Sequence, residues 1–347
     1  MACMPELGSV PAGLRGLLLG ELPGIAGSID RENRVPDGFL ERLREEGAFD
    51  LGSPASLLEA VRLASRSSPA VGHLILIHGT AWCRVRGLVG EPGIVAVSIT
   101  EPGGGTDVLG NLETRAEPGG GGRYLVSGVK VFTSNALYAR YFLVLARGPG
   151  GPTLYLAERS DSIMVEPLDL TTLRGAGVAR VEYRAAEAVE AGTPGKGLRE
   201  ALEAINLGRL GYAAIGLGIA EGALEAAVRW SLEHKVFGKP LADYQGPRWM
   251  LAEVALEARA LEALIREAAS EASDCRVDPL KAAMAKVLGA RLAQRASWIA
   301  TQLMGGRGLS RWSLTERLSR DSRALDIGEG AREVLLDFIA SRVLKGG

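Results

Sequence analysis

The sequence is poor in cysteine, in histidine and in net charge. Its three cysteines, at positions 3, 83 and 275 of 347 residues, are odd in number and far apart, so we expect no disulfide framework and a reducing compartment. The three histidines, His73, His78 and His234, have no metal-ligand spacing with one another or with a cysteine, and we expect no metal site. The net charge of −1 gives no overall attraction to nucleic acid.

Long apolar runs are also missing. The longest, near 74–77 and 213–220, are too short to cross a bilayer, so no membrane span is expected. The first residues lack a basic segment followed by an apolar core and a cleavage site, and we therefore expect a cytoplasmic protein without a signal peptide. The chain is 47% hydrophobic and 23% charged, which indicates a globular protein of two or three packed units.

The pattern of apolar residues divides the chain into three zones. The first, 1–93, has helical spacing in GFLERLREEGAF, and Ser53-Pro54 opens a further helix. The second, 94–190, consists of short β-branched or aromatic runs, which predict a small antiparallel sheet or barrel in which EPGGGG, 117–122, connects two strands. The third, 191–347, returns to long amphipathic helices. The predicted fold is α+β and mostly α: an N-terminal helical domain, a middle β domain and a C-terminal four-helix bundle.

Two short sequences of the middle zone offer donors to a heterocycle or a phosphate. The first, 98–107, leaves a strand and places Thr100 and Thr106 around three glycines with free backbone N–H groups. An ordinary glycine turn would have the same sequence. The second, 128–135, places Phe132 to pack on a flat ring and Ser134 to donate to its polar edge. Taken alone, this pattern favours a plain strand with an aromatic core residue.

The tail of the chain combines a glycine cluster with an isolated carboxylate. Gln302 is followed by GGRG, which is not a dinucleotide fingerprint because it follows a helix rather than a strand. Glu329 stands between two glycines just before a final apolar helix, where backbone can approach a ligand and a side chain can reach it. Glu329 is therefore a candidate base. The alternative is an acid at a helix start that interacts only with the helix dipole.

Taken together and in this order, these sequences resemble the acyl-CoA dehydrogenase family. TEPGGGTD and GVKVFTSN are similar to the family's TEPxxGSD and GxKxxITN strands. EHKVFGKPLADYQ is similar to its RxxFGxxLxxxQ turn, and QLMGGRG followed by RD and EGA is similar to its QxxGGxG, RD and YEGT tail. The resemblance covers nearly the whole chain and is weakest over the first 35 residues and over 150–190.

The resemblance implies a function in which FAD and an acyl-CoA thioester meet. In the family the glutamate of the tail removes the α-proton while flavin N5 takes hydride from the β-carbon, and by position that base is Glu329. The developing negative charge on the thioester oxygen is stabilised by the backbone N–H of this glutamate and by a flavin ribityl hydroxyl. The implied partners are an electron-transfer flavoprotein and further copies of the chain, as a dimer or a tetramer.

The site residues carry over one by one from the resemblance. The residues that match positions lining the isoalloxazine are Thr100, Thr106, Phe132 and Ser134. The residues that match positions offered by a neighbouring subunit to the rest of the FAD are His234, Phe237, Gln302, Gly305 and Gly306. The residues that match the substrate side of the base are Arg209, Gly328 and Gly330. Some branched-chain members carry the base on the helix of Arg209, but the corresponding residue here is Gly208, which cannot titrate.

Several positions depart from the family pattern. His234 replaces an arginine and Val236 a threonine, so we expect weaker contacts to the FAD pyrophosphate. Phe132 replaces a tryptophan, and Ala331 a threonine. Gly328 replaces an aromatic residue beside the base, which predicts extra space for a bulky or branched acyl group. Two other functions are kept open: a family member that uses O2 as an oxidase or monooxygenase, and a non-catalytic relative that binds flavin or a partner.

Overall fold

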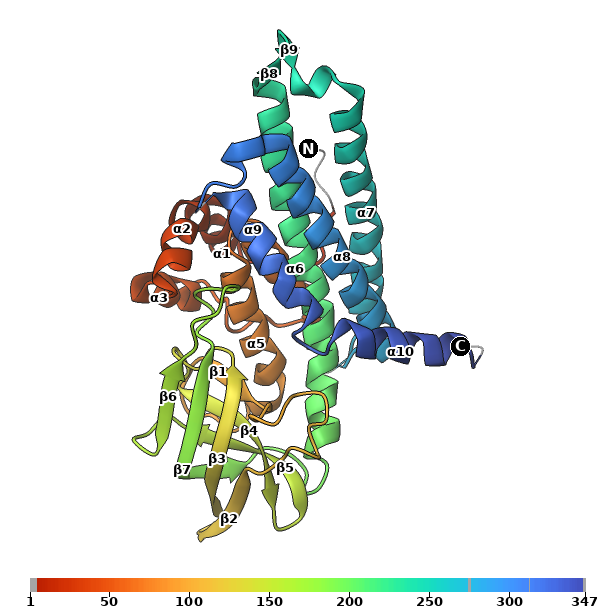
Figure 1. The fold of residues 1–347 in the computed structure, drawn as a ribbon. Helices are drawn as coiled ribbons and strands as arrows, with labels where there is room; N and C mark the ends of the chain where they lie inside the picture. The colour runs from red at the N-terminus through yellow and green to blue at the C-terminus, as the bar shows by residue number, and fades with distance from the viewer. Residues whose placement is uncertain (1–4, 274–275, 312, 346–347) are drawn as a thin grey trace.

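The structure, a computed structural model, describes residues 5–273, 276–311 and 313–345. Short helices come first (Figure 1): α1 (Ala12–Gly16), one π turn (Leu17–Glu21), α2 (Leu22–Glu32), α3 (Asp37–Glu45), α4 (Pro54–Ser65) and α5 (Pro69–Val85). Ser53 begins α4 as expected, because its hydroxyl accepts a hydrogen bond from the Ser56 N–H at 3.1 Å. The last two of these helices, α4 and α5, pack on the long helix α6 (Gly197–Glu233). This packing places α5 at the functional site.

The middle of the chain forms a small β domain. Its strands are β1 (Val95–Ser98), β2 (Arg115–Gly120), β3 (Arg123–Thr133), β4 (Tyr141–Gly148), β5 (Gly151–Glu158), β6 (Ile163–Pro167) and β7 (Ala179–Glu190). The ladders run from β4 through β2, β3, β7 and β5 and return to β4, so these strands close a ring. β1 and β6 flank it by pairing with β4 and β7. Side chains such as Val126, Phe142 and Tyr155 fill the interior.

The β domain differs from its prediction in three details. β1 and β2 pair with β4 in parallel, whereas a purely antiparallel sheet was expected. β2 continues through the first four residues of EPGGGG, so only Gly121 and Gly122 make the turn. β6 has no recognisable pattern because only Ile163 of its five residues is buried. The α+β, mostly helical fold class itself is confirmed.

α6 (Gly197–Glu233) is the central element and runs the length of the molecule (Figure 1). Glycines allow its neighbours to approach closely: a Cβ on Gly216 would lie 2.4 Å from the Gly289 carbonyl oxygen of α8, and one on Gly218 would lie 2.4 Å from the Arg62 carbonyl oxygen of α4. By length and composition α6 passes the test for a membrane span, but 83% of its most apolar stretch is buried inside the protein. Burial by protein neighbours accounts for its hydrophobicity.

The other C-terminal helices are α7 (Gln245–Ser270), α8 (Pro279–Met304), α9 (Leu314–Ser322) and α10 (Arg332–Val343), with a small hairpin of β8 (Lys235–Val236) and β9 (Lys239–Pro240) before α7. Of these, α7, α8 and α9 pack on α6, and α10 packs on α8. Asp278 begins α8 as expected, since its carboxylate accepts from the Lys281 N–H at 2.7 Å. The final segment is less regular: a 3-10 turn (Arg323–Asp326) and a loop precede α10, which projects away from the bundle (Figure 1). That loop carries Glu329.

One expectation about the cysteines is wrong. Cys83, on α5, is disulfide-bonded, whereas no disulfide was expected. Sequence spacing misleads here because it says nothing about which residues far apart in the chain become neighbours. The other two cysteines, at positions 3 and 275, lie outside the described residues.

Candidate active site

Glu329 lies in a loop of unusual backbone conformation. Its φ is +56°, in the left-handed region that residues other than glycine seldom adopt, and Gly330 follows with φ +102°. Such strain persists only where surrounding structure holds it, and it concentrates at functional sites. Within the described residues, the backbone N–H of Glu329 has no hydrogen-bond acceptor, so it is available to a ligand.

Two cations from different helices hold this loop by its carbonyl groups. Arg209 of α6 donates from Nε to the Glu329 carbonyl oxygen at 3.0 Å, and its Nη1 donates to Asn206 at 2.8 Å. Lys286 of α8 donates from Nζ to the Gly330 carbonyl oxygen at 2.8 Å. Each cation thus bonds the main chain while its charge lies near the Glu329 carboxylate. The arrangement fixes the position of the carboxylate without a direct ion pair to it.

Burial sets the protonation of the groups in this loop. Loss of solvent raises the pKa of Glu329 to about 7, and the charges of Arg209 and Lys286 limit the rise. Burial also lowers the pKa of Lys286 to about 8, against the attraction of Asp326 and Glu329. A carboxylate with a pKa near neutrality can both accept and release a proton under ordinary conditions. These are the properties of a general base.

The raised pKa predicts how stability depends on pH. Between pH 4.5 and about 7 the native protein keeps the Glu329 proton that the unfolded chain releases, so stability falls as pH rises. A tenfold change in proton affinity corresponds to about 1.4 kcal/mol, and the cost above pH 7 is therefore roughly 3 kcal/mol. Glu329→Gln removes it. We expect this variant to unfold at higher denaturant than wild type at pH 8, with no gain below pH 4.5. An equal gain at both pH values would contradict the assignment.

Gly208 of α6 lies directly against the Glu329 carboxylate. A Cβ on Gly208 would come within 2.5 Å of Glu329 Oε2, so the carboxylate occupies the space that a side chain there would need. This is the position at which some branched-chain members of the resembled family carry their base. A side chain at position 208 and the Glu329 carboxylate would thus occupy the same space. A carboxylate can be presented there either from the loop or from the helix.

The space expected beside Gly328 is not open. A Cβ at this position would meet the Tyr212 hydroxyl at 2.2 Å and its ring carbon Cζ at 2.8 Å. Tyr212, on α6, is buried, and burial raises the pKa of its phenol. The expectation of extra room for a bulky acyl group is therefore wrong. An aromatic ring does lie beside the Glu329 loop, but it comes from α6 instead of from the loop itself.

The predicted flavin residues of the β domain come together at one edge. Glu101 joins the two motifs: its carboxylate accepts from the N–H groups of Glu113 and Thr114 at 2.7 and 3.0 Å and from Lys130 Nζ at 2.8 Å. The Thr100 carbonyl accepts from the Val131 N–H at 2.9 Å. Burial lowers the pKa of Lys130 to about 8 although Glu101 favours its charged form. These bonds place Thr100 and the loop of Thr106 beside the end of β3.

The end of β3 presents an aromatic face next to a hydroxyl. Phe132 has φ +54° and leaves 59% of its side chain exposed, which is unusual for a phenylalanine in a strand. Ser134 is half-buried, and its hydroxyl lies 2.8 Å from His73 Nε2. The exposed Phe132 ring, with the Ser134 hydroxyl close to it and the Thr100 main chain bonded to Val131, offers a flat face and a hydrogen-bond donor that suit an acceptor-rich isoalloxazine. The donor chemistry of this edge therefore fits FAD.

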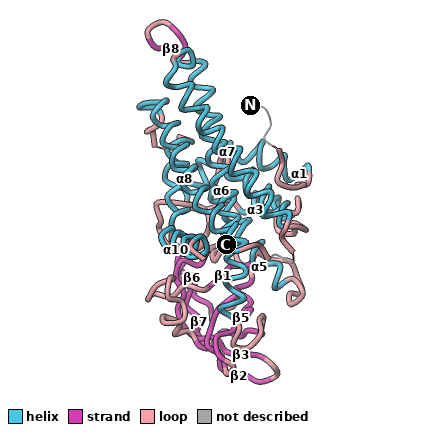
Figure 2. Tube along the Cα trace, turned by 90° about the vertical axis from the view of Figure 1, so that its right-hand side faces the viewer, coloured by secondary structure: helices cyan, strands magenta, loops and turns pink. Residues whose placement is uncertain are grey.

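The remaining predicted FAD residues lie at the opposite end of the molecule. Phe237 lies in the turn of the β8–β9 hairpin and His234 directly precedes this hairpin, which lies far from the β domain in both views (Figures 1 and 2). Phe237 is 96% exposed with φ +47°. Gln302 is exposed at the end of α8, and a Cβ on Gly305 or Gly306 would meet nothing within 4 Å. One protomer does not bring these residues to its own Thr100 and Ser134.

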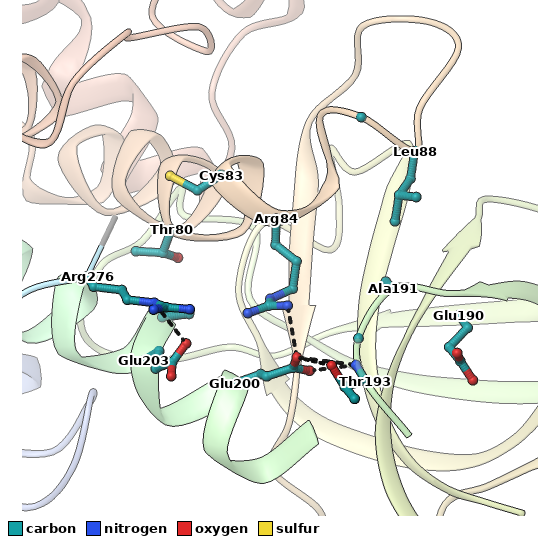
Figure 3. Close-up of a pocket in the computed structure, with 13 residues that line it drawn as sticks. Thr80, Cys83, Arg84, Leu88, Glu190, Ala191, Thr193, Glu200, Glu203 and Arg276 are labelled. Atoms are coloured by element: carbon teal, nitrogen blue, oxygen red, sulfur yellow. Dashed lines mark hydrogen bonds and ion pairs between the residues drawn. The ribbon is translucent and has the colours of Figure 1, made fainter. Parts of the chain in front are cut away.

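A separate pocket of about 510 Å³ opens where α5 and the start of α6 meet the end of β7 (Figure 3). Among the described residues, none of the predicted site residues lines it. Its charged side chains pair with one another: Arg84 lies 3.4 Å from Glu200, and Arg276 lies 3.5 Å from Glu203. Its wall includes Ala204, one helical turn before Gly208.

Three residues of the site were missed by sequence reasoning. They are His73, Tyr212 and Lys286, all nearly inaccessible to solvent. The pattern around Lys286 could have pointed to it, because it stands among alanines at buried positions of a helix, where an unpaired lysine is rarely found. His73 and Tyr212 give no such sign, since each is compatible with an ordinary apolar helix face.

Comparison with known proteins gives a consistent result over most of the chain. Residues 195–344 match the family model described as acyl-CoA dehydrogenase, C-terminal domain, and residues 96–185 match the model of the middle domain. The chain is 31% identical over 258 residues to the probable acyl-CoA dehydrogenase YngJ of Bacillus subtilis, covering 71% of this chain and 67% of that protein.

Two further similarities extend over nearly the full length. The CarC subunit of the caffeyl-CoA reductase–Etf complex of Acetobacterium woodii is 25% identical over 357 residues, covering 92% of this chain and 93% of that one. The structure of butyryl-CoA dehydrogenase from Megasphaera elsdenii superposes with a TM-score of 0.88 at 24% identity, covering 97% of this chain and 98% of that chain. The last likeness shows the fold.

Proposed function

The chain belongs to the acyl-CoA dehydrogenase family, and from this premise we propose that it catalyses FAD-dependent α,β-dehydrogenation of an acyl-CoA thioester with Glu329 as the base. The observation that carries the proposal is the Glu329 loop. A carboxylate whose pKa is about 7 lies on a left-handed backbone that Arg209 and Lys286 hold from two helices. A structural glutamate would need none of these features.

The proposed chemistry follows from the geometry of this loop. An α-C–H beside a thioester is weakly acidic, so its removal requires a base near neutrality and a donor for the negative charge that develops on the carbonyl oxygen. The Glu329 carboxylate supplies the first. Its free backbone N–H supplies the second, and one such donor contributes roughly 3 kcal/mol to the transition state. Substrate that expels water raises the pKa of Glu329 further, which favours the protonated product state.

FAD is the cofactor of the proposal. Phe132 and the hydroxyls of Ser134, Thr100 and Thr106 would hold its ring system, for which this edge of the β domain is suited. When bound, FAD supplies the acceptor for the hydride that leaves the β-carbon. Exclusion of water from this edge would protect the reduced FAD from side reactions with solvent.

A second copy of the chain would complete the cofactor site. The exposed hairpin of Phe237 and the open backbone of Gly305 and Gly306 lie far from the β domain of their own protomer, so they fit a neighbour's FAD. Exposed apolar side chains on α7 and α8, among them Leu256 and Trp298, support burial against a partner helix. Sedimentation velocity is expected to give a dimer or tetramer. A monomer that binds FAD would contradict this part.

An electron-transfer flavoprotein is the proposed acceptor of the electrons. The relative named as a subunit of the caffeyl-CoA reductase–Etf complex supports it. Reduction of a purified electron-transfer flavoprotein by the acyl-CoA-reduced enzyme would test the pairing directly. Rapid reoxidation by O2 alone would instead favour the oxidase or monooxygenase alternative.

The function is tested by loading the protein with FAD and adding acyl-CoA thioesters of different chain length without oxygen. We expect loss of the flavin absorption near 450 nm with at least one of them and formation of the corresponding enoyl-CoA. The matched controls are the 3-hydroxyacyl-CoA of the same chain length and the free carboxylic acid without CoA. A protein that binds FAD but is bleached by no thioester would support the non-catalytic alternative and contradict the proposal.

A further inference from the structure

His73 is a buried titratable residue that the proposed chemistry leaves without a role. It lies on α5 with 3% of its surface exposed. Its Nε2 is 2.8 Å from the Ser134 hydroxyl oxygen, and within the described residues its Nδ1 has no hydrogen-bond partner. Its ring meets that of Tyr212 edge to face, with 5.7 Å between centroids. His73 therefore touches the flavin edge on one side and the ring that packs beside the base loop on the other.

The unpartnered nitrogen determines which tautomer His73 adopts. Burial lowers the pKa of His73 to about 4, so the ring is neutral and carries one N–H. A proton on Nδ1 would be a buried donor facing no acceptor, which proteins rarely tolerate. A proton on Nε2 leaves only a bare lone pair at Nδ1, which costs less. We therefore assign the proton to Nε2, from which it is donated to the Ser134 oxygen.

This assignment fixes what Ser134 can do. Its oxygen accepts from His73, and in the part of the chain that the structure describes it has no other hydrogen-bond partner. Its own O–H proton is therefore free and directed away from His73. Beside it lies the exposed ring of Phe132, where the flat heterocycle of the proposed cofactor would pack. Without His73, the hydroxyl would rotate freely and could accept as readily as donate.

We propose that His73 is a positioning residue that holds Ser134 as a hydrogen-bond donor to the flavin and so favours flavin reduction. The inference rests on the proposed function, because it needs FAD at this edge. A donor to a ring acceptor stabilises the ring as it gains electron density, which shifts the equilibrium toward the reduced form. His73 also contacts Tyr212, the ring that lies beside the Glu329 loop. The proposed flavin contact at Ser134 and the Glu329 loop are therefore both packed against the same pair of buried rings.

The test compares two substitutions of the same residue. His73→Phe keeps a ring against Tyr212 but removes the N–H, while His73→Gln places an amide N–H close to where Nε2 stood. We expect the ratio of reduced to oxidised flavin, measured against a redox dye, to fall on the order of tenfold in His73→Phe, as for the loss of one hydrogen bond to a charged group. His73→Gln should restore most of it. Equal behaviour of both variants and wild type would overturn the proposal.

A double-mutant cycle with Ser134→Ala separates positioning from packing. If His73 acts through Ser134, His73→Phe should shift the flavin equilibrium in the wild-type background and leave it unchanged in Ser134→Ala. Equal shifts in both backgrounds would show that the histidine acts otherwise. Thermal unfolding of each variant identifies loss of fold, and His73→Gln carries the comparison if His73→Phe does not fold.

The tautomer itself can be measured without cofactor or turnover. Nitrogen-15 NMR of the histidine side chains in the FAD-free protein should show His73 neutral at pH 7 with its proton on Nε2, and the Nε2 signal should move in Ser134→Ala. A proton on Nδ1 would overturn the inference while leaving the proposed dehydrogenase activity intact. Conversely, a protein with the expected tautomer that oxidises no acyl-CoA would refute the proposed function instead.

Discussion

Glu329→Gln is expected to slow flavin reduction by acyl-CoA by at least 10²–10⁴-fold, the range attributable to one general base. Glutamine has the size of glutamate and can keep the loop conformation, so FAD binding should be unchanged. The substitution removes the carboxylate that would accept the α-proton at neutral pH. Arg209 and Lys286, the cations next to it, cannot replace it because they are donors already engaged with carbonyl oxygens. Anaerobic stopped-flow absorbance measures the rate.

The rate should also follow the protonation of the base. With a pKa of about 7, the free enzyme gains active carboxylate as pH rises from 6 to 8, so kcat/KM of the wild type should rise and then level off. Glu329→Asp is the matched control: it keeps the charge but shortens the reach by one methylene, and an intermediate rate is expected. Wild-type bleaching in Glu329→Gln would move the base to another residue.

Position 208 provides a gain-of-function version of the same test. The double variant Gly208→Glu with Glu329→Gly presents a carboxylate from α6 at the place where the original one stood, since the Gly208 Cβ direction leads to Glu329 Oε2. We expect its rate of flavin reduction to exceed that of Glu329→Gly alone. No recovery, in a folded protein that binds FAD, would show that the helix cannot aim a carboxylate at the α-proton.

Gly216→Ala is expected to destabilise the protein by about 3 kcal/mol, although alanine is the better helix former. Its Cβ would lie 2.4 Å from the Gly289 carbonyl oxygen and 3.0 Å from the Gly289 Cα, so two helix backbones would have to separate. Because α6 and α8 make the most extensive helix contact of the fold, this separation disturbs the core. Chemical denaturation of the purified variants measures the loss.

Gly24→Ala is the matched control for this change. Gly24 lies inside α2, is exposed, and its Cβ would meet nothing within 4 Å. The same substitution should therefore stabilise the protein there by up to about 1 kcal/mol through helix propensity alone. Opposite signs for the two variants are expected. A Gly216→Ala protein as stable as wild type would show that α6 and α8 can move apart at little cost.

Much of the fold could be predicted because local chemistry agrees with it. Ser53 and Asp278 begin helices as their sequences indicate, and the β-branched and aromatic runs of the middle zone mark most of its strands. The proposed base, Glu329, could be singled out from the two glycines that flank it. The sequence did not reveal what holds the Glu329 loop, because this depends on Arg209 and Lys286, which bond its carbonyl oxygens from helices far away in the chain.

The wrong expectations have a common physical cause. Gly328 suggested an open space because a glycine leaves room, but Tyr212 from α6 fills that room. The odd number and wide spacing of the cysteines suggested no disulfide, yet Cys83 is disulfide-bonded. Tyr212 lies on another element, and local patterns carry no information about such a neighbour. Side-chain packing between elements is what the fold adds to the sequence.

The attachment of the Glu329 loop also bears on how such a site can change over time. Arg209 and Lys286 hold carbonyl oxygens, which every amino acid possesses, and they hold none of the loop's side chains. A substitution at 331 therefore leaves the anchoring intact, whereas any side chain at 328 would first have to displace the Tyr212 ring that lies beside the loop. Acquisition of a new substrate and retention of the proton-abstracting group become separable evolutionary steps.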